Sequence, residues 1–488
     1  MEKSEPASAA RAPEQQSDSA RVDRPWVFFD RAFIVPLIVA CALFVENMDS
    51  TVIATSLPMI ARDLGKDPIV LKLGLSSYLV SLAVFIPISG WMADRFGGRT
   101  IFRIAIGIFM ASSMLCGLST TFYGFVAARF LQGVGGAMMV PVGRIVILRS
   151  IPREELVTAF NYLTIPAILG PVIGPPLGGM ITTYVSWRWI FFINVPISLL
   201  GIFLAGRFME NVREDERPPL DVVGFILSAL GLSLSIFGLT TIHDRLVSTR
   251  FSLGCMLAGA ACMTVYFLHA RHKTQPLLEL GLLKIKTYWV GVGGGSLFRI
   301  GIGGLSLLLP LMFQLGFGMN PLQSGLLTCA SAIGAMFMKS VVKLVLRLFG
   351  FRRVLITNAI LASGTIAAFG LFTIRTPRLL VFAILLIGGC FRSLQFTSIN
   401  AIAFADIADD AVSKATSLFA TIQQLSFGVG VTAGAFALQT SSFLQGHQTI
   451  VAADFWPAFL ALGLLAASSA WSAVSMSKTA GEIMAGRK

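Results

Sequence analysis

Long apolar runs recur along almost the whole chain, and short polar or charged stretches separate them. Each run holds about 20 residues, which at about 1.5 Å rise per residue lets one α-helix cross a hydrocarbon core of roughly 30 Å. The runs are too long and too evenly apolar for barrel strands, which alternate in polarity. They predict about fourteen membrane-spanning helices, at residues 33–58, 73–93, 102–119, 122–148, 158–183, 189–207, 221–241, 251–270, 288–314, 324–346, 354–374, 379–404, 415–440 and 454–476.

Composition agrees with this pattern. Hydrophobic residues make up 55% of the 488 positions and charged residues 13%, whereas a soluble domain carries roughly a quarter of its residues as charges. The mean hydropathy is +0.77. All six cysteines fall inside apolar runs and the four histidines lie in predicted loops or at helix ends, so we expect no metal site. The sequence predicts an all-α integral membrane protein.

The distribution of positive charge predicts an orientation. Most of the 38 Lys and Arg fall in the tails and in those loops that share one side of the predicted membrane. Cytoplasmic loops carry this excess, so we expect both termini to be cytoplasmic. The expected location, the inner (plasma) membrane, belongs to the function hypothesis given below. The formal charge of +13 then needs no nucleic acid as a partner. Residues 1–30 are polar, show no cleavable signal, and are predicted to be a disordered tail.

A faint internal repeat indicates two related halves. The stretches "RFGGRTIF" from Arg95 and "LFGFRRVLI" from Leu348 each join an even span to an odd one, and their Phe-Gly-x-Arg cores are 253 residues apart. We expect a tail at 1–30, a six-helix bundle at 31–207, two linker helices at 208–280, a second six-helix bundle at 281–476, and a tail at 477–488. Chance likeness between two basic, glycine-containing loops is the alternative.

Two acidic residues, Glu46 and Asp49, are predicted to lie inside the membrane. A charged side chain at the bilayer centre costs about 2.5 to 3.5 kcal/mol on insertion scales, so it normally faces water or a partner. Their spacing places both on one face of a helix together with Ser50. Carboxyl groups in such a place are candidates to carry protons. The alternative is a pair of acids held permanently by a buried arginine.

Six basic residues also fall inside predicted spans. Arg144, Lys339 and Lys343 lie close enough to an interface for their side chains to reach it. Arg129, Arg299 and Arg392 lie deeper, and the last two belong to the second half, which has no deep carboxylate. We expect a central cavity with acids on one wall and arginines on the other. Gln132, Arg299, Arg392, Gln395 and Asn400 are the candidate residues that line it.

Five short motifs occur in order along these spans. They are "MDSTVIATSLP", "GWMADRFGGRTIF", "RFLQGVGGAMMVPVGR", "LGPVIGPPLGG" and "SWRWIFFINVP". Together they resemble the major facilitator superfamily, specifically its fourteen-helix drug:proton antiporter branch, over residues 33 to 476. The matching positions are Asp49, Thr51, Leu57, Pro58, Gly90, Asp94, Arg95, Gly97, Arg99, Arg129, Gln132, Gly133, Gly136, Gly170, Pro171, Gly174, Pro175, Gly178 and Gly179.

The resemblance implies the major facilitator fold, with two six-helix bundles and two additional helices between them, and transport by alternating access. It implies proton coupling at Asp49 and Arg129, which we extend to Glu46. It also implies a conformational gate in the loop after the second span, with Asp94 against the helix that opens near Ala415, and a bendable fifth helix. The gate residues are Gly90, Asp94, Arg95, Gly97 and Arg99, and those of the fifth helix are Gly170, Pro171, Gly174, Pro175, Gly178 and Gly179.

Three departures from the family pattern limit this transfer. Ala54 stands where the first motif commonly has Asn, Glu46 is an acid that the motif does not require, and Arg347 replaces the residue equivalent to Asp94 in the second half. Arg299 and Arg392 also weaken the case for purely cationic substrates.

Proton-coupled export of small amphipathic compounds, or multidrug efflux, is therefore the leading hypothesis. A proton-coupled carrier of one specific anionic metabolite and a transport-inactive membrane sensor or scaffold are the alternatives. The glycine run from Gly291 follows no strand and lacks a Walker lysine, so we expect no nucleotide site. No set of catalytic residues indicates an enzyme, and the expected coupling ion is a proton, with no cofactor. The expected partners are the lipid bilayer, a small-molecule substrate and a periplasmic adaptor, and the expected state is a monomer.

Overall fold

The computed structural model describes residues 31–151, 156–211, 220–241, 247–273, 277–408, 411–447 and 449–477, and it is helical and free of strands throughout these ranges. Twelve of the described helices are long and apolar enough to cross a membrane. This confirms an all-helical membrane protein, but not the predicted count of fourteen spans. The tail predicted at 1–30, and residues 478–488 of the C-terminal tail, lie outside the described residues.

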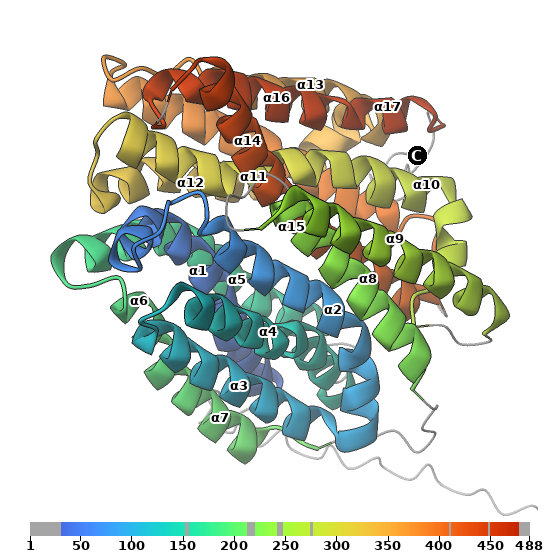
Figure 1. Cartoon of the computed structure of the whole chain (residues 1–488). Coiled ribbons are helices and arrows are strands. Elements are labelled where there is room, and N and C mark those ends of the chain that lie inside the picture. Colours follow the sequence, from blue (N-terminus) through green and yellow to red (C-terminus); the bar gives the residue numbers. More distant parts are fainter. Residues whose placement is uncertain are drawn as a thin grey trace, which may run out of the picture.

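The first half of the chain forms one group of helices (Figure 1). Its elements are α1 (Arg31–Asp63), α2 (Lys72–Phe96), α3 (Gly98–Leu118), α4 (Phe122–Ser150), α5 (Leu156–Tyr184), α6 (Trp189–Phe192) and α7 (Asn194–Phe208). We call α1 to α7 the first half. The helix α1 continues through Pro58 to Asp63, so the predicted end at residue 58 was too early.

Two helices, α8 (Val222–Thr241) and α9 (Thr249–His272), pack against each other beside α2 and α15. The second half follows them and forms the other large group in Figure 1. Its elements are η3 (Leu280–Lys284), α10 (Lys286–Trp289), η4 (Val290–Gly294), α11 (Gly295–Leu311), η5 (Met312–Gly316), α12 (Pro321–Phe349), α13 (Phe351–Phe369), α14 (Arg378–Ala403), α15 (Val412–Leu444), η7 (Ala452–Asp454), α16 (Phe455–Ala467) and α17 (Ser469–Val474).

The predicted spans missing from the twelve correspond to α5 and α13. The helix α13 begins with Arg352 and Arg353 in its first turn, which lowers its hydropathy. The predicted span at 288–314 is an α-helix bracketed by two π-helical turns, η4 and η5. Such wide turns occur mostly as single insertions within α-helices and often at functional sites.

Glycines in the same backbone state end α2 and α12. Gly97 has φ 93° and Gly350 has φ 75°, which side chains with a Cβ rarely adopt. Each glycine is followed at once by the next helix, α3 or α13, and they are 253 residues apart. The turn geometry therefore repeats along with the sequence. We call the end of the molecule with these two turns the glycine end and the opposite end the far end.

The two halves share one hydrophobic core at the far end. One cluster joins Met48, Val52 and Leu57 of α1 to Met312 and Phe313 of η5. Two cross-half hydrogen bonds also lie there: Gln314 Nε2 donates to the carbonyl of Thr55 at 2.8 Å, and the backbone amide of Leu322 donates to Thr183 Oγ1 at 3.2 Å.

Separate cores lie toward the glycine end. One cluster contains Val39 of α1 and Phe102 of α3 and is built from buried residues of the first half. Another contains Tyr288 and Phe419 and is built from α9 and the second half. The halves are therefore joined by a common core at the far end, while toward the glycine end the first half has a cluster of its own that meets the second half through the partly buried Ala420 of α15.

Candidate functional site

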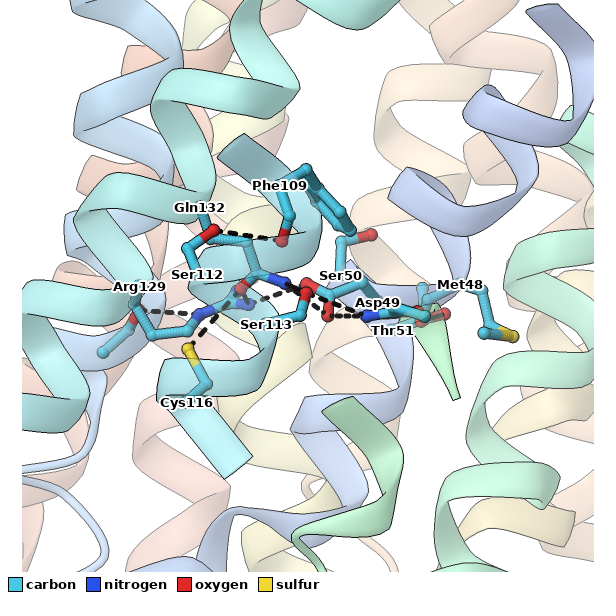
Figure 2. A network of polar contacts seen from close by, with 12 residues as sticks. Met48, Asp49, Ser50, Thr51, Phe109, Ser112, Ser113, Cys116, Arg129 and Gln132 are labelled. Carbon is cyan, nitrogen blue, oxygen red and sulfur yellow. Dashed lines mark hydrogen bonds and ion pairs between the residues drawn. The ribbon is translucent and has the colours of Figure 1, made fainter. Parts of the chain in front are cut away.

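Asp49 lies in the middle of α1 and is the centre of a buried polar network (Figure 2). Arg129 Nη1 donates to its Oδ2 at 2.7 Å. Gln132 Nε2 and Asn194 Nδ2 each donate to its Oδ1 at 3.0 Å. The carboxylate thus accepts bonds from α4 and α7, and its side chain is only 2% exposed. These bonds tie three helices of the first half to one charge.

Arg129 is fully buried and has more than one partner. Besides Asp49, its Nη1 donates to Gln132 Oε1, and its Nε donates to the carbonyl of Gly74 on α2 at 3.4 Å. Its guanidinium lies over the ring of Tyr78, 4.4 Å from the centroid, a distance at which a cation is attracted to the face of the ring. Arg129, which the family resemblance grouped with Asp49 in proton coupling, therefore lies against Asp49.

A second layer of polar groups fixes the amides. Gln132 Nε2 also donates to Ser113 Oγ at 2.7 Å, and Asn194 Nδ2 approaches the same oxygen at 3.3 Å. Cys116 Sγ lies 3.8 Å from Gln132 Oε1. The structure thus assigns Gln132 to the Asp49 network, whereas the sequence analysis grouped it with the substrate cavity. Asn194, Ser113 and Tyr78 were not predicted as site residues, although Asn194 stands in the quoted motif "SWRWIFFINVP".

Glu46 lies one turn before Asp49 in different surroundings. It is within electrostatic reach of Arg144 and of Asp49. Its Oε2 is buried and has no hydrogen-bond partner among the described residues, and the same is true of the hydroxyl of Tyr78. An unpartnered carboxylate oxygen is costly in an apolar interior. A proton, a water molecule or a donor on a substrate would satisfy it.

The predicted basic wall lies in the second half. Arg299 on α11 donates to Asn400 Oδ1 on α14 and to the carbonyl of Gly291, each at 3.2 Å. Arg392 on α14 lies over the ring of Phe369, 5.4 Å from its centroid. The structure therefore brings Arg299 and Asn400 together.

Gln395 belongs to a different set of contacts. It accepts a bond from Asn358 Nδ2 at 3.0 Å and donates to the carbonyl of Leu355 at 3.1 Å. Both partners are on α13, so its amide is engaged within the second half.

The five predicted gate residues lie at the glycine end. Asp94 accepts a bond from Arg149 Nη2 on α4 at 2.8 Å, so in this conformation it pairs within its own half and not with the helix that contains Ala415. Arg95 lies over Trp91, and Arg99 Nη1 is 3.5 Å from the carbonyl of Met209. The two glycines differ: a Cβ at Gly90 would meet open space, whereas one at Gly97 would collide with Asn211.

The glycine and proline motif of α5 lies between the two halves. Gly170, Gly174 and Gly178 face α1, where a Cβ at Gly178 would lie 2.8 Å from the carbonyl oxygen of Val52. Gly179 faces the carbonyl of Pro321 at the start of α12. The same interface is seen from α12, where Gly325 faces the carbonyl of Pro175 of α5. Pro171, the remaining residue of the motif, follows Gly170 on α5. Such small-residue stripes let helices approach closely.

The chain is similar to proteins of known family. The model of the Major Facilitator Superfamily matches residues 39–431. A relative from Klebsiella pneumoniae (strain 342), which carries the name multidrug resistance protein MdtD, is 35% identical over 87% of this chain and 89% of its own. A relative of the same name from Escherichia coli O6:H1 is 37% identical over 81% of this chain and 84% of its own.

Solved structures agree on the fold. A D-xylose–proton symporter superposes with a TM-score of 0.66 at 14% identity and covers 93% of this chain and 99% of its own. A POT family transporter in complex with a thioalcohol-conjugated peptide has a TM-score of 0.66 at 15% identity and covers 90% of this chain and 94% of its own. From the matched family model and these relatives, the chain belongs to the Major Facilitator Superfamily and is a multi-pass membrane transporter, not an enzyme.

Proposed function

We propose that the chain exports small amphipathic compounds in exchange for protons across a bacterial inner membrane, with both termini cytoplasmic. The relatives named as multidrug resistance proteins support the transported class. The observation that carries the proposal is the buried Asp49 carboxylate, which accepts bonds from Arg129, Gln132 and Asn194. A change in its protonation acts on α1, α4 and α7 together.

Magnitudes indicate how a proton is coupled to movement. Leaving a buried arginine without its acid costs about 3–5 kcal/mol, whereas one proton that crosses a potential of 100 mV releases about 2.3 kcal/mol. The energy that one proton releases is therefore too small to separate Arg129 from Asp49 in the closed interior by protonation of Asp49 alone. A new partner for Arg129, either water or substrate, has to arrive at the same step. This requirement links proton binding to opening.

Glu46 is the second acid in the proposed proton path. One of its oxygens is unpartnered, and it lies close enough to Asp49 for the two charges to interact. A proton that enters the interior therefore meets an unengaged carboxyl oxygen at Glu46 and fully engaged oxygens at Asp49. We assign Glu46 the exchange with water and Asp49 the coupling to helix movement.

Alternating access requires that the packing between the two halves loosens at one end of the molecule as it tightens at the other. In this conformation Asp94 pairs with Arg149. In the opposite conformation we propose that Asp94 moves to the beginning of α15, whose partial positive charge favours an anion. The stripe of small residues on α5 would be the surface on which the halves move.

The test is uptake of ethidium into proteoliposomes that hold the purified full chain, driven by an imposed pH gradient. We expect Asp49→Asn to abolish gradient-driven uptake and Glu46→Gln to reduce it strongly. Asp63→Asn is the matched control, because Asp63 is on the same helix but is 45% exposed at its far end, and it should leave uptake unchanged. Uptake that persists in Asp49→Asn/Glu46→Gln would refute proton coupling by these acids.

A further inference from the structure

The second half holds two arginine side chains whose donors are incompletely used. Arg299 is fully buried on α11 and makes two hydrogen bonds, to Asn400 and Gly291, while its Nε is buried without a partner among the described residues. Arg392 on α14 has a buried Nη1 that is also without a partner there. A guanidinium offers five donors and stays charged in proteins. Both groups therefore retain capacity to bind an anion.

No acid in the surrounding helices can neutralise these charges. The segments 286–316, 321–349, 351–369, 378–403, 412–444 and 455–474 contain no Asp or Glu. In the first half, Asp49 is already paired with Arg129, and Glu46 interacts with Arg144. A buried charge that has no opposite charge is strongly unfavourable. No acid of these described helices therefore supplies the counter-charge, and an anion bound from outside the chain would supply it.

Aromatic rings surround the same groups. The guanidinium of Arg299 lies 4.6 Å from the ring centroid of Phe419 and 5.8 Å from that of Phe396. Phe396 in turn contacts Phe427, with ring centroids 6.3 Å apart. Arg392, Phe396 and Asn400 follow one another at four-residue spacing on α14, so they share one face of that helix. This face offers charged donors and flat apolar surfaces together.

We propose that this face of α14, with Arg299, binds the acidic group of an amphipathic organic anion, a carboxylate or sulfonate attached to an apolar ring body. The inference rests on the proposed function, because it names the substrate class of that exporter. The acidic group would accept a bond from the unengaged Nε of Arg299, and the rings would contact its apolar body. Arg392, eight residues before Asn400 on α14, would offer its unengaged Nη1 to a polar group farther along the ligand. In the empty site the cation–π contacts stabilise the two guanidinium charges in part, and a bound anion would neutralise them.

The charge of the substrate also predicts how transport responds to voltage. Export of a monovalent anion in exchange for one proton moves two positive charges inward, whereas export of a monovalent cation by the same exchange moves none. A membrane potential should therefore act strongly on the first process and not on the second. This difference can be measured without knowledge of the natural substrate.

The experiment uses proteoliposomes with the cytoplasmic face outward and an acidic lumen. Taurocholate, a sulfonate on a steroid body, and ethidium, a flat cation, are the two probes. We expect a lumen-positive potential, set with potassium and valinomycin, to accelerate taurocholate uptake. Arg299→Gln and Arg392→Gln should each weaken taurocholate binding at least tenfold, about 1.4 kcal/mol, and Arg299→Lys should restore part of it. Lys343→Gln, which removes an exposed charge from α12 in the same half, should bind as the native chain does.

A binding assay keeps the inference testable if a variant transports poorly. Taurocholate should raise the Tm of the native protein in detergent, and this rise should be lost in Arg299→Gln. If ethidium uptake follows the pH gradient but taurocholate neither binds nor moves, the anion site is refuted and the proposed exporter stands. If taurocholate binds through the arginines but no probe follows the pH gradient, the site stands and proton-driven export is refuted.

Discussion

Asp49→Asn removes the charge on which the buried network depends. The substituted side chain offers one carbonyl oxygen and one NH2 group, but the network presents three donors to this position. If the carbonyl faces Arg129, the NH2 faces Gln132 and Asn194. These two amides can rotate to present oxygens, but rotation of Gln132 disturbs its bond to Ser113. Arg129 in every case keeps a full charge without an acid.

The expected cost is about 3–5 kcal/mol, the usual penalty when one member of a buried ion pair is removed. We expect a Tm in detergent several degrees below that of the native protein and no uptake driven by a pH gradient. In Asp49→Asn/Arg129→Gln the unpaired charge is gone, so most of the lost stability should return. Uptake should not return, because the titrating group is still absent.

The assay combines thermal unfolding of the four proteins, as a double-mutant cycle, with uptake in proteoliposomes. A coupling free energy of several kcal/mol between the two positions is expected. The reasoning is refuted if Asp49→Asn is as stable as the native chain, because Arg129 would then not depend on this acid. It is also refuted if the double variant regains gradient-driven uptake.

Three further predictions follow from local packing. Gly97→Ala should lower stability by about 1–3 kcal/mol, because its φ of 93° is open only to glycine and a Cβ would strike Asn211; Gly364→Ala, which meets open space, should leave the Tm unchanged. Gly179→Val should abolish uptake by forcing α5 away from the carbonyl of Pro321, and uptake equal to that of Gly364→Ala would contradict this. Burial acts to raise the pKa of Asp221, but hydrogen bonds from His269 and from the amide of Gly224 outweigh it and lower this pKa. Asp221→Asn should therefore lower the Tm at pH 7. The difference should shrink as the pH falls below about 4, first as the carboxyl of the unfolded chain binds a proton and then, at lower pH, as the native carboxyl does; a difference that does not change with pH would count against the pairing.

The sequence predicted the helices well because the membrane imposes a length and a polarity on each span. The sequence predicted the ends of the helices less well where the chain departs from regular α-helical winding. Pro58 does not end α1, although it has no N–H to donate; the helix continues to Asp63. The predicted span at 454–476 is divided into α16 and α17 at Ser468, a break that apolar periodicity does not reveal.

The site was predictable only in part. An acid and an arginine buried in apolar helices are conspicuous because each is costly alone, and this pointed to Asp49 and Arg129. Asn194 and Ser113 carry no such penalty, since amides and hydroxyls are common in membrane helices and bond to their own backbone. Their role depends on the packing of α3 and α7 beside α1, across 145 residues in the case of Asn194 and Asp49. The partner of Asp94 likewise depends on conformation, which no motif specifies.

The π-helical turns η4 and η5, on either side of α11, determine where in this stretch a residue can be deleted or inserted without turning α11 relative to its neighbours. A π-turn absorbs one extra residue locally, so the helix on either side keeps its phase. Deletion of one residue within Val290–Gly294 should return ordinary winding and leave Arg299 facing as it does now. The same deletion in the middle of α11 would turn all that follows by about 100° relative to what precedes it. Family members that lose or gain a single residue here are therefore expected to do so at the wide turns.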